Sequence, residues 1–481
     1  MGLLGILLGL GLLVGLAFRG WSVLLLTPLA ALVAAAFSGV PLLASWTQLF
    51  MPAAAGFVAS FFPLFLLGAV FGKLMDDTGS ITAIARWMKD TLGVERTILS
   101  VVLAGALVTY GGVNLFVALF VLVPMAIGMF REAGLPRRLI PPTVGLGSMT
   151  FTMSALPGTP AVQNAIPMPF FGTTPFAAPG LGLIGAAIML GFGLWWLARA
   201  EARARAAGEG FGDAPPPPAP DEGRLREVAS TAREFDPAEA TRGAHAPGEP
   251  PFWLAAAPLG VVIVVNLVMS FAVLPALDTG FLAEPLWGGT TLASVAGIWS
   301  VAVALLAGIL VLVLGNAARL PKLRDTLDAG ANASALPILS VASLVGFGAV
   351  VAALPAFQAV QAAVLNLGGG PVVSLAVATN ILAALTGSAS GGMTIALDAL
   401  GATFLEIARV EGIDPGLLHR VAVMSAGTLD ALPHNGAVVT LLAVAGVTHR
   451  DSYGALFMVL IVGSLLALGV VVALGSLLGS F

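Results

Sequence analysis

The chain is built largely from apolar runs of about twenty residues. Such a run, folded as a helix, can cross a hydrocarbon core roughly 30 Å thick. Only 10% of the 481 residues are charged, whereas soluble domains carry roughly 25%. The sequence therefore predicts an all-α polytopic membrane protein rather than a large soluble protein with buried helices. We expect about ten to twelve transmembrane segments from apolar spans near 3–18, 21–37, 49–75, 97–130, 139–155, 180–198, 252–273, 290–315, 334–354, 370–408, 418–430 and 453–478.

One polar segment divides the chain. Of its 46 charged residues, 17 fall between Arg199 and Glu249, around the stretch DAPPPPAPDEG. A segment this polar buries too little apolar surface to order itself. We therefore predict a first membrane half at 1–198, a disordered linker at 199–250 and a second membrane half at 251–481. Arginines at the start of the linker place it in the cytoplasm by the positive-inside rule.

The composition also excludes several functions. There is no cysteine, hence no disulfide and no thiolate metal site. The sequence has no Walker-type phosphate loop, so ATP hydrolysis is not expected to drive its function. It has no basic patch, so nucleic acid is not an expected partner. Asp430 and His434 offer two metal ligands where a site commonly needs three or more, so we predict no metal. The N-terminal apolar run lacks a positive n-region and is interpreted as a retained helix.

A short segment occurs twice. ALPGTPAV at 155–162 and ALPHNGAV at 431–438 agree at five of eight positions. Upstream of each copy lies a glycine-rich interruption of a long apolar span, TYGGVN at 109–114 and TGSASGG at 386–392. A span of about 35 residues is too long for one crossing. The shared order of break, helix, turn and octapeptide indicates an internal duplication with two re-entrant hairpins and two broken helices.

Paired broken segments in two halves are the best sequence indication of a transporter's binding site near the bilayer midplane. Breaks free backbone groups that lipid cannot satisfy, so protein, water or ligand must bind them. Uncharged polar side chains gather at these points and suit a small hydroxycarboxylate. The alternative is that Ser and Thr bond to their own helices or join helices together. The candidate substrate-binding residues are Tyr110, Asn114, Thr159, Asn164, Ser388, Ser390, His434 and Asn435.

Ionisable groups are costly inside a membrane and commonly functional there. Of four histidines, only His434 lies in a break, whereas His419 lies beside an arginine at an expected helix end. Asp430 precedes His434 by four residues, so one helical turn would bring the pair together. Such a pair can carry a proton near neutral pH. A structural hydrogen bond is the alternative, and Asp398 is a second proton-coupling candidate.

Three segments, 109–141, 151–182 and 425–444, resemble the gluconate permease family of gluconate:proton symporters, within the ion transporter superfamily. The resemblance covers nearly the whole chain except the linker. It implies proton-driven import of small hydroxycarboxylates across a bacterial inner membrane, and no cofactor. It also implies inverted repeats, a homodimer and elevator-type movement. The hairpin tips would be Tyr110–Asn114 and Ser388–Gly392, and the unwound helices Leu156–Asn164 and Asp430–Gly436.

One departure from the family bears on the substrate. Gluconate-specific members share His-Val-Asn-Asp-Ser-Gly near the last break, where this chain reads Leu432 to Gly436 as LPHNG. A shorter hydroxyacid such as 3-hydroxybutyrate therefore stands beside gluconate as the expected substrate. Sodium-coupled uptake of di- or tricarboxylates on the same fold is the main alternative. An intramembrane enzyme using Asp430 and His434 is the remote one.

Overall fold

The computed structural model describes residues 2–17, 21–212, 245–365, 368–433 and 435–481, and among these it contains helices and no strand. The prediction of an all-α protein is therefore confirmed. The helices of the first part are α1 (Gly2–Ala17), α2 (Val23–Ser38), α3 (Leu42–Ala44), α4 (Met51–Asp77), α5 (Ser80–Leu92), α6 (Thr97–Tyr110), α7 (Leu115–Glu132), α8 (Ile140–Ser148), α9 (Phe151–Ser154), α10 (Val162–Ala165), α11 (Pro167–Phe171) and α12 (Pro179–Ala206). Those of the second part are α15 (Phe252–Val268), α16 (Leu274–Ala276), α17 (Leu292–Gly315), α18 (Leu323–Ala333), α19 (Ala335–Ala353), α20 (Phe357–Leu365), α21 (Gly370–Thr386), α22 (Ala389–Glu411), α23 (Pro415–Ala426), α24 (Gly436–Ala445), α25 (His449–Leu456) and α26 (Gly463–Leu478).

Seven described helices are long and apolar enough to cross a membrane, or eight if a bent pair counts as one span. That pair is Ser80–Leu92 with Val94–Tyr110, bent by 113°. Four further apolar helices, α1, α2, α21 and α24, are shorter. The expected ten to twelve segments are therefore reached only by counting shorter or broken segments with the long ones, because each break divides a crossing into pieces.

The helix α4 and the continuous span formed by α18 and α19 run in opposite directions. A Cβ on Gly330 would lie 2.7 Å from Val70 Cα, and one on Gly346 would lie 2.8 Å from the Phe50 ring. As the residue number rises along α18 and α19, the residue number of the contact falls from Val70, within α4, to Phe50, directly before α4. The helix α4 therefore ends on the side of the molecule where α18 begins, and α19 ends on the opposite side.

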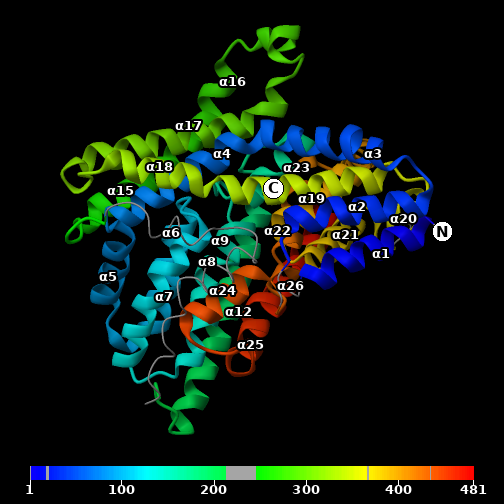
Figure 1. Cartoon of the computed structure of the whole chain (residues 1–481). Helices are drawn as coiled ribbons and strands as arrows, with labels where there is room; N and C mark the ends of the chain where they lie inside the picture. The colour runs from blue at the N-terminus through cyan, green and yellow to red at the C-terminus, as the bar shows by residue number, and fades with distance from the viewer. Residues whose placement is uncertain (1, 18–20, 213–244, 366–367, 434) are drawn as a thin grey trace.

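Each of these helices leads to a hairpin. The α6–α7 hairpin follows the end of α4 through α5, and the α21–α22 hairpin follows the end of α19 through α20. Because α4 and α19 end on opposite sides of the molecule, the two hairpins enter the helical body from opposite sides, as expected for inverted repeats. Figure 1 shows α5, α6 and α7 together on one flank, and α1, α2, α20 and α21 on the other.

The hairpins turn at the predicted glycine-rich interruptions. The helix α6 ends at Tyr110 and α7 begins at Leu115, with the Asn114 side chain accepting a hydrogen bond from the Phe116 amide. In the second hairpin Gly387, at a φ of 63°, ends α21, and Ser388 caps α22. A Cβ on Gly392 would lie 2.3 Å from Ala383 N, so only glycine lets the two arms pack this closely. The second turn is shorter than predicted, since Ser390 to Gly392 already belong to α22.

Both octapeptides interrupt helices. No helix covers residues 155–161 between α9 and α10, and α23 is separated from α24 by a single turn at Leu429–Ala431 and extended backbone at Leu432. The pieces interlock across the two parts: α11 packs on α22, and α24 packs on α7. The helix after each break thus rests on the second arm of the other part's hairpin. This exchange joins the hairpins and broken helices into one body.

The ends of the linker pack against the helical body. The helix α12 continues to Ala206, past the boundary expected at residue 198. Arg138 then binds Glu209 through two hydrogen bonds of 2.6 Å. Residues 213–244 lie outside the described part of the chain. At the far end, the Ala246 amide donates to the Asp77 carbonyl at 2.8 Å, and Arg86 pairs with Glu249 at 2.7 Å.

His245 lies over a carboxylate pair in this contact. Its Nε2 is 3.5 Å from Asp76 Oδ2 and its Nδ1 is 3.8 Å from Asp77 Oδ1. Lys73 pairs with Asp77 at 2.8 Å, and Thr326 donates to Asp77 at 2.6 Å. Hydrogen bonding to Asp76 raises the pKa of His245, against burial and the Lys73 charge, which lower it.

We expect segment 245–249 to bind α4 more tightly below the ordinary histidine pKa of about 6.5 than above it. A pKa raised by folding adds stability that is fully present below the unfolded pKa and is lost as pH rises through the folded pKa. Hydrogen exchange at Ala246, followed from acid to mildly alkaline pH and corrected for intrinsic exchange, measures this docking.

His245→Gln should remove the pH dependence of that protection. The matched control is Glu249→Gln, which breaks the pair with Arg86 but leaves His245 in place, so the pH dependence should persist. Equal pH dependence in the chain and in His245→Gln would contradict the role of this histidine.

Candidate functional site

The first break is held by side chains that bind its free carbonyl groups. The Tyr110 hydroxyl, at the tip of the first hairpin, donates to the Pro157 carbonyl at 2.7 Å. Asn266, on α15, donates to the Gly158 carbonyl at 2.9 Å. Asn164 donates to the carbonyls of Thr159 and Pro175, both at 3.0 Å. The break is therefore stabilised by its own residues, by the hairpin tip and by α15.

The second break is held in a related way. Asn435 Nδ2 donates to the Gly387 carbonyl at 2.9 Å and to Asp430 Oδ1 at 2.7 Å. His449 Nε2 lies 2.8 Å from the Pro433 carbonyl oxygen, and Tyr453 donates to the Ala431 carbonyl at 3.1 Å. The Pro157 and Pro433 carbonyls, which occupy the same place in the two octapeptides, are thus both bound by side chains.

The repeat also preserves a local turn. Thr159 and Asn435 occupy the same octapeptide position, and each accepts from the backbone amide two residues later. The Ala161 amide is 3.4 Å from Thr159 Oγ1, and the Ala437 amide is 2.7 Å from Asn435 Oδ1. Asn435 is the N-cap of α24, because its side-chain oxygen binds amides that the helix leaves free. Thr159 forms a turn ahead of α10, whose own N-cap is Ala161. Substrate binding stays a prediction for both residues.

A cavity of about 110 Å³ lies where the first hairpin tip meets the first break. One ordered water needs roughly 10–15 Å³ measured this way, so the cavity has room for a small solute. One wall is formed by α4, α17 and the junction of α18 with α19, and the other by Gly112–Phe116, Pro160–Gln163 and Ser390. Both hairpins therefore contribute to the same cavity.

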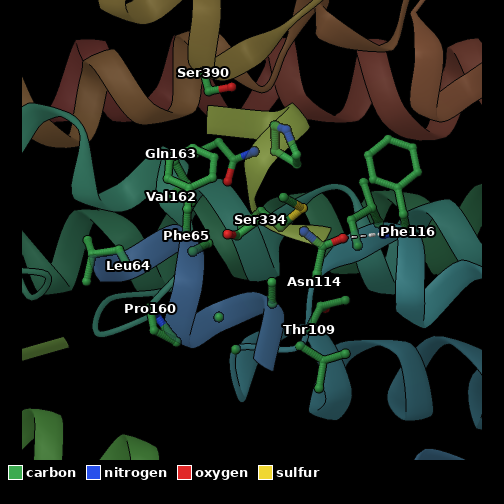
Figure 2. Close-up of a pocket in the computed structure, with 18 of the residues that line it drawn as sticks. Leu64, Phe65, Thr109, Asn114, Phe116, Pro160, Val162, Gln163, Ser334 and Ser390 are labelled. Atoms are coloured by element: carbon green, nitrogen blue, oxygen red, sulfur yellow. Dashed lines mark hydrogen bonds between the residues drawn. The ribbon is translucent and has the colours of Figure 1, made fainter. Parts of the chain in front are cut away.

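The cavity carries neutral polar groups. Its polar side chains are Thr109, Asn114, Gln163, Ser334 and Ser390, and no charged side chain is among the described residues that line it. Figure 2 shows the Gln163 amide above the Ser334 hydroxyl and the Asn114 amide to its right. Asn114 Oδ1 accepts from the Phe116 amide at 2.9 Å, which leaves its Nδ2 as the donor that faces the cavity.

The predicted substrate-binding residues separate into two groups. Asn114 and Ser390 line the cavity. Tyr110, Thr159, Asn164, Ser388 and Asn435 instead bind backbone groups of the breaks and hairpin tips. His434 lies outside the described residues, so its predicted role stays a prediction.

The two acidic candidates lie apart from the cavity lining. Asp398 lies on the exposed face of α22, and Asp430 lies in the single helical turn Leu429–Ala431. The expected helical turn between Asp430 and position 434 is wrong, because the backbone is extended at Leu432. Proline at 433 explains this, since it disfavours helix at the residue before it. The described partner of Asp430 is Asn435.

His419 was expected beside an arginine at a helix end. It lies instead within α23, and both His419 and Arg420 are fully buried there. His419 Nε2 is 3.2 Å from Asn164 Oδ1 and its Nδ1 is 2.6 Å from Thr173 Oγ1. An oxygen that only accepts requires the proton on Nε2, so Nδ1 accepts from the threonine. No local sequence pattern identifies the role of Arg420, because its hydrogen-bond partners lie in the first half of the chain.

Two family models match adjoining parts of the chain. Residues 1–169 match the GntP family permeases, which confirms the resemblance to gluconate permeases over the first part. Residues 167–473 match the Na+/H+ antiporter family. The chain is also 40% identical over 485 residues to the protein named "Uncharacterized transporter YxjC" of Bacillus subtilis (strain 168), covering 100% of both chains.

One solved structure shares the fold, and a second aligns less closely. MtrF of Neisseria gonorrhoeae, described as one of a class of antimetabolite efflux pumps, aligns with a TM-score of 0.53 at 13% identity, over 91% of this chain and 84% of that one. The YdaH transporter of Alcanivorax borkumensis aligns with a TM-score of 0.48 at 18% identity, over 88% and 86%. The two family models and the similarity to YxjC confirm a transporter rather than an enzyme.

Tyr110→Phe should lower the thermal stability of the purified protein. The substitution leaves the Pro157 carbonyl without its side-chain donor, and an unsatisfied buried polar group costs about 1–3 kcal/mol. Differential scanning fluorimetry in detergent measures the change. Tyr453→Phe, which removes the donor to Ala431, should have a smaller effect because its hydrogen bond is longer. An unchanged unfolding midpoint for Tyr110→Phe would show that this hydrogen bond does not hold the break.

Proposed function

This chain belongs to the family of membrane transporters that contains YxjC, and from that premise we propose that it is a secondary active transporter for a small organic hydroxycarboxylate. The substrate class includes gluconate and 3-hydroxybutyrate, and import is driven by proton symport. The hairpins and broken helices move as one body against the remaining helices, in an elevator-type cycle.

The observation that carries this proposal is the neutral cavity between the two hairpins. The N-terminus of α7 lies at the wall of the cavity, and a helix N-terminus attracts negative charge. Asn114 and Gln163 add amide groups, and Ser334 and Ser390 add hydroxyls that can bind a substrate hydroxyl. One carboxylate can be held by such dipoles without a fixed cation. Two or three carboxylates would need more positive charge, which favours a monocarboxylate.

The construction of the cavity supports elevator movement. Its wall from α4, α17, α18 and α19 is mostly apolar, with Leu64, Phe65, Leu305 and Val341. The opposite wall belongs to the interlocked hairpins and broken helices. A binding site between a framework and a separate body can change the side to which it opens when that body moves. The homodimer implied by the family resemblance stays a prediction.

The distribution of basic residues gives the orientation. Described arginines and lysines gather on the side where α4 ends, whereas only Arg409 lies at the opposite end, where α22 ends. By the positive-inside rule, the side where α4 ends is cytoplasmic, and both ends of the linker lie there. The basic residues on that side are Lys73, Arg86, Lys89, Arg96, Arg131, Arg137, Arg138, Arg199, Arg203, Arg205, Arg319, Lys322, Arg324 and Arg450, whereas Arg420 is buried inside the helical body.

Sodium coupling is the second candidate. The match of residues 167–473 to the Na+/H+ antiporter family favours it. Uptake of labelled gluconate, 3-hydroxybutyrate, lactate and citrate into proteoliposomes, with either a proton or a sodium gradient, separates the two. Accumulation of a monocarboxylate with protons alone supports the proposal. Accumulation that requires a sodium gradient would contradict proton coupling and support sodium coupling. Accumulation of citrate alone would contradict the proposed class of monocarboxylate substrates.

Asn114→Asp should reduce substrate uptake by about tenfold or more, a loss of about 1.4 kcal/mol in binding. The carboxylate still caps α7, so the helix forms, but the amide donor is lost and a negative charge faces the anionic substrate. Initial uptake rates in proteoliposomes measure the effect.

The matched control is Asn332→Asp, because Asn332 is an exposed asparagine on α18 with no described hydrogen bond. It should transport at the rate of the unchanged protein. If Asn114→Asp also transports at that rate, the cavity is not the substrate site.

Asp430→Asn should uncouple substrate movement from protons. The amide can still bind Asn435 but cannot release a proton at neutral pH. Uptake driven by a pH gradient should be lost, whereas exchange of labelled for unlabelled substrate should persist. His434→Ala should do the same if it shares the proton, and Asp398→Asn serves as the comparison on the exposed face of α22. Unchanged pH-driven accumulation in Asp430→Asn and His434→Ala would exclude both residues as proton carriers.

A further inference from the structure

Arg420 is the largest fully buried side chain of the described residues, with 0% of its surface exposed. No described carboxylate lies within ion-pair distance of it. An ion buried without a counter-charge is strongly unfavourable unless dipoles or hydrogen bonds replace its water. The partners of this guanidinium therefore define its role.

Those partners are all neutral oxygens around the first break. Arg420 Nη2 donates to the Ala177 carbonyl at 2.8 Å and Nε donates to the same oxygen at 3.2 Å. Its Nη1 donates to the Ser154 carbonyl at 3.3 Å and lies 3.4 Å from Asn164 Oδ1. Ser154 is the last residue of α9, so its carbonyl lies at the negative end of a helical segment.

The surrounding residues are shaped for this arrangement. Asn164 gives both amide hydrogens to carbonyls, and this turns its oxygen toward His419 and Arg420. A Cβ on Gly182 would lie 2.5 Å from the Ala155 carbonyl oxygen and 3.2 Å from Arg420 Nε. The helix α12 therefore carries no side chain where the guanidinium lies. The three oxygens of Ser154, Asn164 and Ala177 form what we call the oxygen cage.

Carbonyl and amide oxygens freed at a helix break are the ligands that replace the hydration shell of a monovalent cation in channels and transporters. We propose that the Arg420 guanidinium is a built-in cation that occupies the oxygen cage, and that the cage becomes a binding site for a free monovalent cation when Arg420 is removed.

The second break differs at the corresponding place. The octapeptide offset of 276 residues pairs Ser154 with Asp430. One break thus holds a permanent positive charge, and the other holds a carboxylate bound by Asn435. If the proposed function holds, Arg420 already fills the cage, so sodium has no binding site at the first break. The charged group that couples transport to an ion then lies at the second break. The cage itself does not depend on what the protein transports.

The test measures cation binding through stability, with no transport assay. Thermal unfolding is followed for the purified unchanged protein, for Arg420→Ala and for the exposed control Arg409→Ala. Each is measured in choline chloride, sodium chloride, potassium chloride and a low, non-denaturing concentration of methylguanidinium chloride. The protein and Arg409→Ala should have the same midpoint in all four salts. Arg420→Ala should unfold several degrees lower in choline and should recover toward the original midpoint in methylguanidinium or an alkali cation.

Two further variants keep the test decisive if Arg420→Ala does not fold. Arg420→Lys retains the charge and should remain insensitive to the salt. Arg420→Gln retains hydrogen bonding without the charge and should require a cation for full stability. If neither Arg420→Ala nor Arg420→Gln responds to any cation, or if Arg420→Lys and Arg420→Gln respond alike, the cage is not a cation site. Failure of substrate uptake in the protein itself would overturn the proposed function and leave this result unaffected.

Discussion

The need to satisfy backbone groups inside a membrane governs the rest of this structure. A helix satisfies its own carbonyls, but each octapeptide leaves several free at a depth where lipid offers no donor. Tyr110 binds the Pro157 carbonyl, Asn266 binds Gly158 and His449 contacts Pro433. Breaks therefore exist only where other segments supply donors. This requirement draws the hairpin tips onto the broken helices and makes one body from pieces of both halves.

The duplication preserves backbone geometry more closely than side-chain chemistry. Thr159 and Asn435 each accept a hydrogen bond from the backbone amide two residues later, yet one accepts with a hydroxyl and the other with an amide oxygen. At another equivalent position, Ser154 offers a carbonyl to Arg420 while Asp430 offers a carboxylate to Asn435. Equivalent positions in the two copies thus bind different groups, a guanidinium at the first break and a carboxylate that accepts from an amide at the second.

The sequence predicted the breaks because their cause is local. Glycine and proline interrupt a helix wherever they occur, and the repetition of ALP distinguished these interruptions from ordinary packing glycines. Asn114 and Ser390 line the cavity, and their predicted role in substrate binding stays a prediction. The turn formed by Thr159 and the capping role of Asn435 were missed, because a polar residue at a break can face either a ligand or its own backbone. Arg420 was missed because its oxygens come from the other half of the chain, at a distance that no local pattern reveals.

The cavity wall also bears on how the interlocked body could move. The wall presents an apolar surface formed by Leu64, Phe65, Leu305 and Val341. Apolar contacts are non-directional, so one such surface can move past another without breaking specific bonds. Asn266 is different, because its hydrogen bond to Gly158 joins α15 to the first break across this boundary. The proposed elevator movement would break that bond and leave the Gly158 carbonyl without its described donor. Residues 160–163, which follow directly, line the cavity. Water or a substrate hydroxyl in the cavity would be the nearest replacement donor, so on this proposal substrate occupancy would lower the cost of the movement.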